Sequence, residues 1–210
     1  DTNPERRDVA ESEQHIPVYA SQQELLEAQT DVEVVTIATP NDSHSDIAIE
    51  ALHHRRHVVI EKPLGLHRLA CEQVIFKALQ ASRQVFCVMQ NRYTPSAEWL
   101  KQLMIENRLG DILYVNINCF WNRDRRYYKP GGWKGTMKQD GGTLFTQFSH
   151  FIDVMYWLFG DIKAIEARFQ NHTHQDLIEF EDTGHASFEF VNGGLGSLNF
   201  TTSVWDTNQE

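Results

Sequence analysis

The amino-acid sequence predicts an α/β fold, in which a partial, doubly wound parallel sheet over residues 1–92 precedes an α+β unit with a mostly antiparallel sheet over residues 93–210. Two observations lead to this prediction. Short β-branched apolar runs alternate with helix-like segments in the first part of the chain. The second part holds a long polar loop, one strong helix and three further strand-like segments, the last two of which are joined by an Asn-Gly-Gly turn.

Each element of the first part is predicted from its apolar pattern. The run DVEVVTIAT over residues 31–39 is predicted to be a buried strand that ends at Pro40-Asn41. The segments after it are predicted as a helix over 46–52, a strand over 57–60, a helix over 66–82 and a strand over 85–89. This alternation of strands and helices implies a parallel sheet with right-handed crossovers.

The second part is predicted to begin with a helix that Thr94 caps and Pro95 opens, running to about Asn107. A strand over 113–121 and a long loop over 120–142 follow, and loops of that length are usually functional or disordered. The remaining elements are predicted as a helix over 144–159, closed by Gly160, and strands over 163–171, 179–190 and 195–202.

Composition excludes several classes of function. The 210 residues carry a formal net charge of -10, which argues against nonspecific nucleic-acid binding because phosphate contacts need clustered Lys and Arg. No apolar run approaches the roughly 20 residues needed to cross a bilayer, so we expect no membrane association. The cysteine count is odd, at three, and there is no CxxC motif, which favours a reducing, cytoplasmic location.

Polar residues follow each of the three predicted parallel strands. Ligands bind outside the carboxyl ends of such strands, so these turns are candidate binding residues. Lys62 stands out because a fixed, partly desolvated lysine suits proton transfer or polarisation of a hydroxyl group. The alternative is that these are ordinary strand-terminating turns. The three turns are Thr39-Pro40-Asn41, Glu61-Lys62-Pro63 and Gln90-Asn91-Arg92.

A second candidate site lies on the helix that follows Gly141-Gly142. At spacings of four, three and four residues, Thr146, His150, Asp153 and Trp157 are expected to share one helical face, where His150 could act as a general base. The alternative is a histidine that Asp153 satisfies at a packing interface. A different stripe of apolar residues is expected to pack on the sheet: Phe148, Ile152, Met155 and Phe159.

The predicted loop over 120–142 is rich in cations and aromatic rings. Cations suit a diphosphate or a carboxylate, and aromatic faces suit a sugar or a uracil ring. The alternative is a solvated loop with ordinary charges. The residues are Arg123, Arg125, Arg126, Tyr127, Tyr128, Lys129, Trp133, Lys134 and Lys138.

The histidines form two further clusters, but no HExxH pattern accompanies them, and we expect no metal site. The clusters are His53, His54 and His57, and His172, His174 and His185.

Three motifs in this order resemble the Gfo/Idh/MocA family: Thr39-Pro40-Asn41 followed by His44, Glu61-Lys62-Pro63, and Gly141-Gly142 followed by His150 and Asp153. The resemblance covers nearly the whole chain. Within the family, the run from Trp133 to Gly160 is most similar to the branch that oxidises the 3-hydroxyl of UDP-N-acetylglucosamine or of its uronic acid.

The resemblance implies a partial Rossmann domain that binds NAD, with NADP disfavoured, and a second domain that supports substrate and oligomer contacts. It implies that Lys62 orients the nicotinamide and the reacting hydroxyl, and that His150 is the general base. The implied cofactor-lining residues are Asp1, Thr39, Pro40, Asn41, His44, Glu61 and Asn91. The implied substrate contacts are Arg123, Lys129, Trp133, Lys134 and Thr146, with a nucleotide sugar as substrate and a homo-oligomer, dimer or tetramer, as the assembly.

Two departures from the family pattern bear on these expectations. Thr146 stands where family members commonly have Asp or Asn, and a threonine cannot act as a carboxylate. The first strand and its Gly-rich phosphate turn have no counterpart, so we expect a chain truncated at both ends, with Asp1 placed where an acidic residue would grip the adenosine ribose. The alternatives are another sugar or cyclitol dehydrogenase, a non-catalytic relative that binds a nucleotide sugar or NAD, and a zinc-dependent hydrolase.

Overall fold

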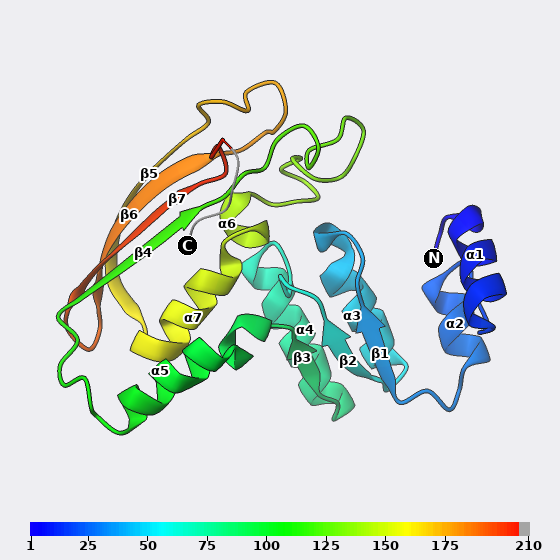
Figure 1. The fold of residues 1–210 in the computed structure, drawn as a ribbon. Helices are drawn as coiled ribbons and strands as arrows, with labels where there is room; N and C mark the ends of the chain where they lie inside the picture. The colour runs from blue at the N-terminus through cyan, green and yellow to red at the C-terminus, as the bar shows by residue number, and fades with distance from the viewer. Residues whose placement is uncertain (206–210) are drawn as a thin grey trace. The chain divides into compact units, whose positions relative to one another are not determined.

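The computed structural model describes residues 1–205 and divides the chain into two compact units (Figure 1). The first unit comprises residues 1–39 and 43–87, and the second comprises residues 40–42 and those from Val88 onward. The short segment 40–42, which follows the first strand, therefore belongs with the second unit. No helix in the described part of the chain is long and apolar enough to cross a membrane.

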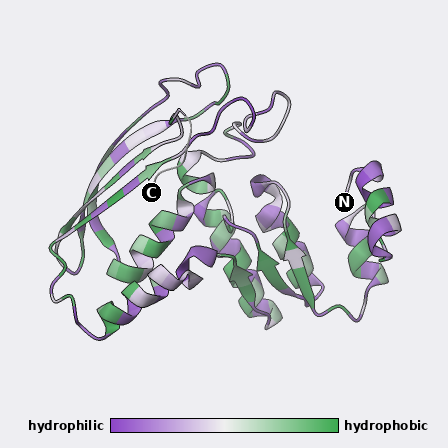
Figure 2. Cartoon of the chain, viewed as in Figure 1, coloured by the Kyte–Doolittle hydropathy of each residue, from purple (hydrophilic) through white to green (hydrophobic). Residues whose placement is uncertain are grey.

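The first unit is built on a parallel sheet, as the sequence predicts, and its strand order is β1-β2-β3. Val34 pairs with His57, and Val58 pairs with Val85. The core holds Ile37, Leu52, Ile60 and Val74, and Figure 2 shows the parallel strands as hydrophobic. The elements are α1 (Pro4–Gln14), α2 (Gln22–Ala28), β1 (Val34–Ile37), α3 (His44–His53), β2 (His57–Ile60), α4 (Arg68–Ala81) and β3 (Val85–Cys87).

Two helices, α1 and α2, precede the first strand and were not predicted. Helix α1 has no buried residue, so its sequence carries no apolar stripe that periodicity could detect. Its start is instead marked by Asn3, whose side chain accepts a hydrogen bond from the Arg6 backbone N–H, and by Pro4 at the first helical position. Helix α2 buries only Leu26.

The second unit packs helices on one face of a mixed sheet in the order β4-β7-β6-β5. β5 pairs with β6, and β6 with β7, in antiparallel fashion, whereas β4 and β7 run parallel. Figure 1 shows α7 along one face of this sheet. The elements are η2 (Gln90–Tyr93), α5 (Pro95–Ile105), β4 (Tyr114–Phe120), α6 (Thr143–Thr146), α7 (Ser149–Phe159), β5 (Ile162–Gln170), β6 (Thr183–Phe190) and β7 (Leu195–Thr201).

The prediction of a single helix over 144–159 is wrong in one respect, because the structure has two helices there, α6 and α7. Thr146 therefore lies on a different helix from His150, and no continuous helical face joins them. At the break, Phe148 is fully buried, with its ring centroid 5.1 Å from that of Trp121 and 5.3 Å from that of Phe200. Burial of this ring against the sheet overrides the local preference for one continuous helix.

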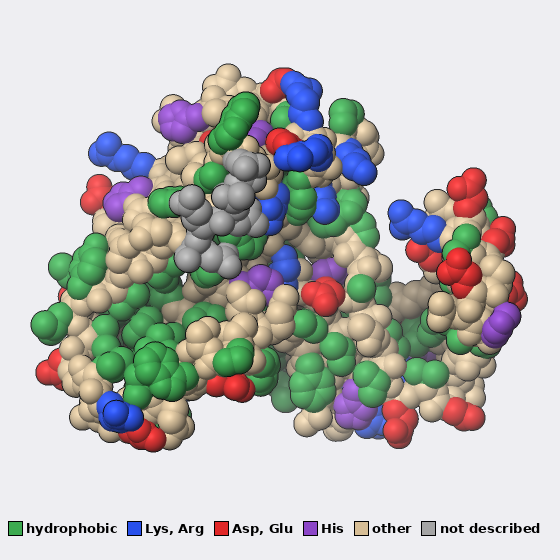
Figure 3. Space-filling model, viewed as in Figure 1, with side chains coloured by type: hydrophobic (Ala, Val, Ile, Leu, Met, Phe, Trp, Pro, Cys, Tyr) green, Lys and Arg blue, Asp and Glu red, His purple; other side chains and the backbone are tan. Residues whose placement is uncertain are grey.

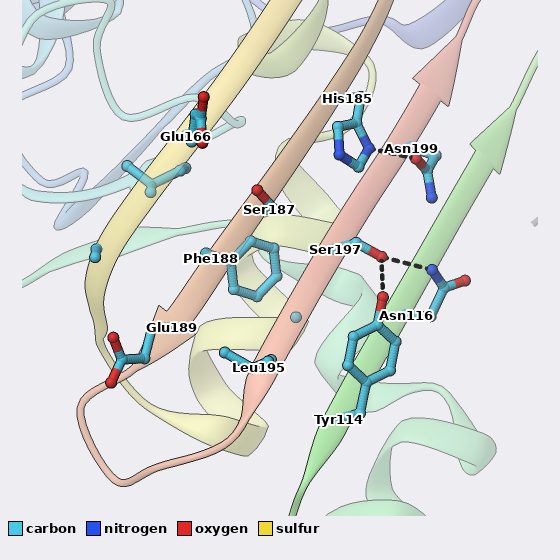
Figure 4. Close-up of a pocket in the computed structure, with 13 residues that line it drawn as sticks. Tyr114, Asn116, Glu166, His185, Ser187, Phe188, Glu189, Leu195, Ser197 and Asn199 are labelled. Atoms are coloured by element: carbon cyan, nitrogen blue, oxygen red, sulfur yellow. Dashed lines mark hydrogen bonds between the residues drawn. The ribbon is translucent and has the colours of Figure 1, made fainter.

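The other face of the second sheet carries a row of hydrogen-bonded polar side chains, drawn in Figure 4. Its residues alternate along the strands with the core residues Val115, Ile117 and Cys119, so they point away from α7. Ser197 Oγ lies 3.0 Å from the Tyr114 hydroxyl and accepts a hydrogen bond from Asn116 Nδ2 at 2.6 Å. The row continues through Asn118, Asn199 and His185. A shallow hollow runs along it.

Candidate active site

In the first unit, the turns after β1 and β2 are joined by a buried histidine. His44 is 1% exposed, and its Nδ1 lies 2.7 Å from the Pro63 carbonyl oxygen while its Nε2 lies 2.9 Å from that of Thr39. The Glu61 N–H donates to the Ile37 carbonyl and extends the ladder between the two strands. His44 thus joins the turn that holds Thr39 to the turn that holds Pro63. Lys62 lies in the second of these turns, and its peptide bond to Pro63 is cis.

Polar groups at the carboxyl edge of a parallel sheet are the donor set that a nucleotide cofactor needs. Thr39 is exposed, and Glu61 and Lys62 are half-buried, so these side chains stand at that edge within reach of a ligand. The edge is therefore a candidate ligand-binding edge of this sheet. His44 has both ring nitrogens at backbone carbonyls, which makes it a support for the turns.

In the second unit, a carboxylate that sequence reasoning missed lies at the centre of a buried polar cluster. Asp140 is 1% exposed, and one carboxylate oxygen accepts the Gly135 N–H at 2.7 Å while the other accepts the Thr146 hydroxyl. Asn41 is also buried, and its amide nitrogen donates to the Asp140 carbonyl at 3.0 Å and to Thr146 Oγ at 3.2 Å. The predicted site residues Asn41 and Thr146 are thus brought together by Asp140.

His150 is buried near the start of α7, but Asp153 does not serve as its partner. The Asp153 carboxylate instead accepts two hydrogen bonds from Arg92, at 2.6 and 2.5 Å. Trp157, four residues further on, accepts a hydrogen bond from Lys101 at its carbonyl oxygen. The arrangement in which Asp153 satisfies His150 is therefore not observed, and Asp153 and Trp157 fasten α7 to η2 and α5.

Cationic side chains of the loop between β4 and α6 fall into two groups, those packed on aromatic rings and those paired with carboxylates. Arg123 donates to Gln147 Oε1 at 2.7 Å, and its guanidinium carbon lies 4.6 Å from the Trp121 ring centroid. Lys134 Nζ lies 3.9 Å from the centroid of Tyr127. The exposed Arg125 and Arg126 instead pair with Asp176 and Asp124. Figure 3 shows Lys and Arg side chains gathered over this loop.

Gln147 is a second residue that sequence reasoning missed. It is 4% exposed, and while its Oε1 accepts from Arg123, its Nε2 donates to the Tyr127 hydroxyl at 2.6 Å. Burial raises the pKa of Tyr127, so this hydroxyl stays protonated. Gln147 lies at the break between α6 and α7, and it therefore ties the basic and aromatic loop to the helix that carries His150.

A second loop, residues 171–182, braces the first. The Glu179 N–H donates to the Gly135 carbonyl, and the Glu179 carboxylate accepts the Met137 N–H at 2.7 Å. The loop itself is organised by Asp182, which is fully buried and accepts hydrogen bonds from the backbone N–H groups of His172 and Thr173. His174 Nδ1 lies 3.0 Å from the same carboxylate.

The two histidine clusters do not assemble into a metal site within residues 1–205, where no group of three or more His, Cys, Asp or Glu side chains is arranged to hold an ion. His174 serves the Asp182 loop, and His185 lies on the open face of the sheet beside Asn199. In the first unit, the backbone N–H of Gln84 donates to His57 Nδ1. These contacts give structural roles to His57, His174 and His185.

Comparison with known proteins agrees with the geometry. Residues 1–89 match a family model described as the oxidoreductase family with an NAD-binding Rossmann fold, and residues 98–210 match the GFO/IDH/MocA C-terminal domain. These matches confirm the fold expected from the resemblance and the expectation of NAD as cofactor.

Solved structures give the same result. The WlbA dehydrogenase of Bordetella pertussis, solved in complex with NADH and UDP-GlcNAcA, is 33% identical to this chain, with a TM-score of 0.94. The match covers 100% of this chain and 60% of the WlbA chain. The WlbA dehydrogenase of Chromobacterium violaceum, with the same ligands, is 34% identical with a TM-score of 0.92, over 99% of this chain and 59% of its own.

A curated relative, the levoglucosan dehydrogenase of Pseudarthrobacter phenanthrenivorans, is 30% identical over 98% of this chain and 61% of its own length. The chain thus spans about 60% of the length of these three proteins.

The Asp182 loop gives a pH-dependent prediction. Burial alone would raise the pKa of the Asp182 carboxyl group, but the hydrogen bonds from His172, Thr173, Thr183 and His174 outweigh burial and lower it well below the ordinary aspartate value. A lowered pKa adds stability that is present above the unfolded pKa of about 3.9 and is lost as the pH falls. We expect Asp182→Asn to lower the free energy of unfolding by roughly 1–3 kcal/mol at neutral pH.

Urea unfolding at a series of pH values measures this effect. The difference between the native protein and Asp182→Asn should shrink as the pH falls below about 4. Asp176→Asn is the matched control, because Asp176 lies in the same loop but is exposed. A stability difference for Asp182→Asn that stays constant across this range would contradict the assignment.

Proposed function

Because the chain belongs to the Gfo/Idh/MocA family of oxidoreductases, we propose that it oxidises a secondary hydroxyl group of a sugar, with NAD as the hydride acceptor. The observation that carries the proposal is the turn Glu61-Lys62-Pro63, which His44 holds at the carboxyl edge of the parallel sheet. A lysine fixed at this edge suits a dehydrogenase because an ammonium group can orient a hydroxyl and stabilise the oxygen as it loses its proton.

The reaction needs a base as well as a cation. We assign His150 as the general base that takes the proton of the hydroxyl group, and Lys62 as the cation that orients that hydroxyl. When bound, NAD would accept a hydride from the carbon that carries the hydroxyl group. The C–H bond breaks with its electron pair, the O–H bond gives its proton to His150, and the sugar carbon becomes a ketone. His150 suits this role because its burial keeps bulk water away from the transferred proton.

The proposed substrate is a UDP-N-acetylhexosamine or its uronic acid, oxidised at C3. Two solved relatives, at 33% and 34% identity, contain UDP-GlcNAcA. In this chain, Arg123 and Lys134 are packed on aromatic rings, which keeps both cations close to surfaces suited to a uracil or sugar ring. Lys129, Trp133 and Thr146 complete the proposed substrate contacts, with Lys129 exposed and able to reach a phosphate or carboxylate.

The cofactor contacts of this chain also remain proposals. Thr39, Pro40 and Glu61 stand in the turns after β1 and β2, and Asn91 lies in η2 of the second unit. The Asn41 amide nitrogen already donates to the Asp140 carbonyl and to Thr146 Oγ. We therefore propose that Asn41 lines the cofactor site without donating a hydrogen bond from this nitrogen. Asp1 is exposed, and we propose it as the ribose contact that favours NAD over NADP.

A second candidate activity is oxidation of a different sugar or cyclitol. The levoglucosan dehydrogenase that is 30% identical favours this alternative, because levoglucosan carries no nucleotide. The two candidates differ in the role of Arg123 and Lys134, which a substrate without phosphate does not need. A relative that binds a nucleotide sugar or NAD without turnover is the non-catalytic alternative.

Turnover tests the proposal. We expect the protein, expressed from its complete coding sequence, to form NADH when it is given NAD with UDP-N-acetylglucosamine or its uronic acid. His150→Ala and Lys62→Met should each lower kcat by roughly 100- to 10,000-fold, while the Kd for NADH in His150→Ala stays within a few-fold. His53→Ala is the matched control, because His53 is exposed on α3.

Each outcome decides between the candidates. Turnover with levoglucosan or a cyclitol alone would keep the dehydrogenase and replace the nucleotide sugar. Retained NADH binding without turnover on any of these substrates would support the non-catalytic alternative. Full activity in His150→Ala would remove His150 from its role as base.

We further propose that the protein forms a dimer or tetramer in the cytoplasm, through the open face of the second sheet. Tyr114, which belongs to the row of hydrogen-bonded side chains, is 60% exposed on this face, and Leu195 is 57% exposed. Light scattering should give two or four copies per particle, and Ser197→Arg should shift the mass toward one copy. A monomeric mass for the native protein at micromolar concentration would contradict this assembly.

A further inference from the structure

The loop between β4 and α6 holds two cations that share one aromatic ring. The Arg123 guanidinium carbon lies 5.1 Å from the Tyr127 ring centroid, and Lys134 Nζ lies 3.9 Å from it. Within residues 1–205, neither cation forms an ion pair with a carboxylate, whereas Arg125 and Arg126 of the same loop do. Like charges held on one ring repel each other, and a bound anion offsets that repulsion. The pair is therefore a candidate anion site.

Gln147 fixes the direction of the hydrogen bonds beside these cations. It is 4% exposed, its Oε1 accepts from Arg123 Nε at 2.7 Å, and its Nε2 donates to the Tyr127 hydroxyl at 2.6 Å. Because an arginine only donates, the amide oxygen must face Arg123 and the amide nitrogen must face Tyr127. The Tyr127 oxygen thus accepts a hydrogen bond from Gln147, and its own proton is directed elsewhere.

The proton of the Tyr127 hydroxyl meets no acceptor in the part of the chain that the structure describes. Burial raises the pKa of Tyr127, so this proton stays in place at neutral pH. Arg123 also has further N–H groups, because its Nε and Nη1 donate to Gln147 and to the Asn122 carbonyl, and a guanidinium has five N–H donors. Tyr127, Arg123 and Lys134 are all partly exposed, so a ligand can meet these donors from solvent.

We infer that Tyr127, Arg123 and Lys134 form a carboxylate subsite, which makes the enzyme selective for a uronic acid over the corresponding neutral sugar. Gln147 is the positioning residue of this subsite. The inference rests on the proposed function and deepens it by choosing between the two proposed substrates. A carboxylate suits these donors because its two oxygens accept hydrogen bonds from a guanidinium and a hydroxyl group at once.

The place of Gln147 in the chain favours a carboxylate on the sugar ring over the diphosphate of a nucleotide. Gln147 lies at the break between α6 and α7, three residues before His150. The subsite is therefore tied to the segment that carries the proposed base, and that base acts on the sugar ring. A uronic acid carries its carboxylate on this ring, whereas the diphosphate lies outside it.

Binding measurements test the inference without depending on turnover. The protein, expressed from its complete coding sequence and saturated with NADH, would be titrated in a calorimeter with three ligands: UDP-N-acetylglucosaminuronic acid, UDP-N-acetylglucosamine and UDP. We expect the uronic acid to bind roughly 10- to 100-fold more tightly than the neutral sugar, because hydrogen bonds to a charged group are the stronger ones.

Tyr127→Phe removes the hydroxyl proton and keeps the ring on which the two cations lie. We expect the Kd for the uronic acid to rise roughly 10-fold, while the Kd values for the neutral sugar and for UDP stay within about two-fold. Tyr156→Phe is the matched control, because Tyr156 is 53% exposed on α7 of the same unit.

Gln147→Glu tests the positioning role. A carboxylate at this position only accepts hydrogen bonds, so it pairs with Arg123 and draws the Tyr127 proton toward itself. We expect the preference for the uronic acid over the neutral sugar to disappear, with a rise of roughly 100-fold in the Kd for the uronic acid. Gln73→Glu is the matched control, because it adds the same charge at an exposed position on α4.

The three ligands separate the possible outcomes. Equal affinity of the native protein for the two sugars, or no binding of the uronic acid, would overturn the inference. An equal loss for all three ligands in Tyr127→Phe would also overturn it, because the site would then read the diphosphate or only support the loop.

Two further outcomes keep the inference decidable. If Gln147→Glu does not fold, as judged by thermal unfolding, the ratio of affinities in Tyr127→Phe decides alone: a native ratio overturns the inference, and a reduced ratio supports it. If the native protein prefers the uronic acid but forms no NADH from it, the proposed oxidation fails and the carboxylate subsite stands.

Discussion

The second unit depends on the burial of one carboxylate. A carboxylate removed from water must find hydrogen-bond donors within the protein, because an unsatisfied buried charge costs several kcal/mol. Asp140 takes donors from Gly135 in the long loop and from Thr146 on α6, and its carbonyl takes one from Asn41. The segment over residues 135–146, which leads into α7, and the distant segment that holds Asn41 are thereby held in one arrangement.

The first unit follows the same rule with a histidine in place of the carboxylate. His44 joins the turns after β1 and β2 through two backbone carbonyls, and Lys62 lies in one of those turns. In both units, buried residues determine where the candidate site residues stand. Lys62 depends on His44, and His150 follows from the break between α6 and α7, where Phe148 and Gln147 are fixed by the core and by Arg123.

The parts of the fold that depend on local pattern could be predicted from the sequence. β2 has the predicted bounds, and Thr94-Pro95 opens α5 as expected, because apolar runs and caps are local signals. Helix α1 was missed because it buries no residue. The helix break and the role of Asp140 could not be predicted, because their causes are contacts between distant residues: Asn41 and Asp140 are 99 positions apart.

Deuterium tracing tests the central claim most directly. UDP-N-acetylglucosaminuronic acid labelled with deuterium at C3 would be given to the protein with NAD, and the label would be located by mass spectrometry. Transfer of hydride predicts that the deuterium appears in the NADH formed and that turnover is slower than with unlabelled substrate. Deuterium that remains on the sugar while NADH forms would contradict oxidation at C3, and release of the label to water would contradict hydride transfer.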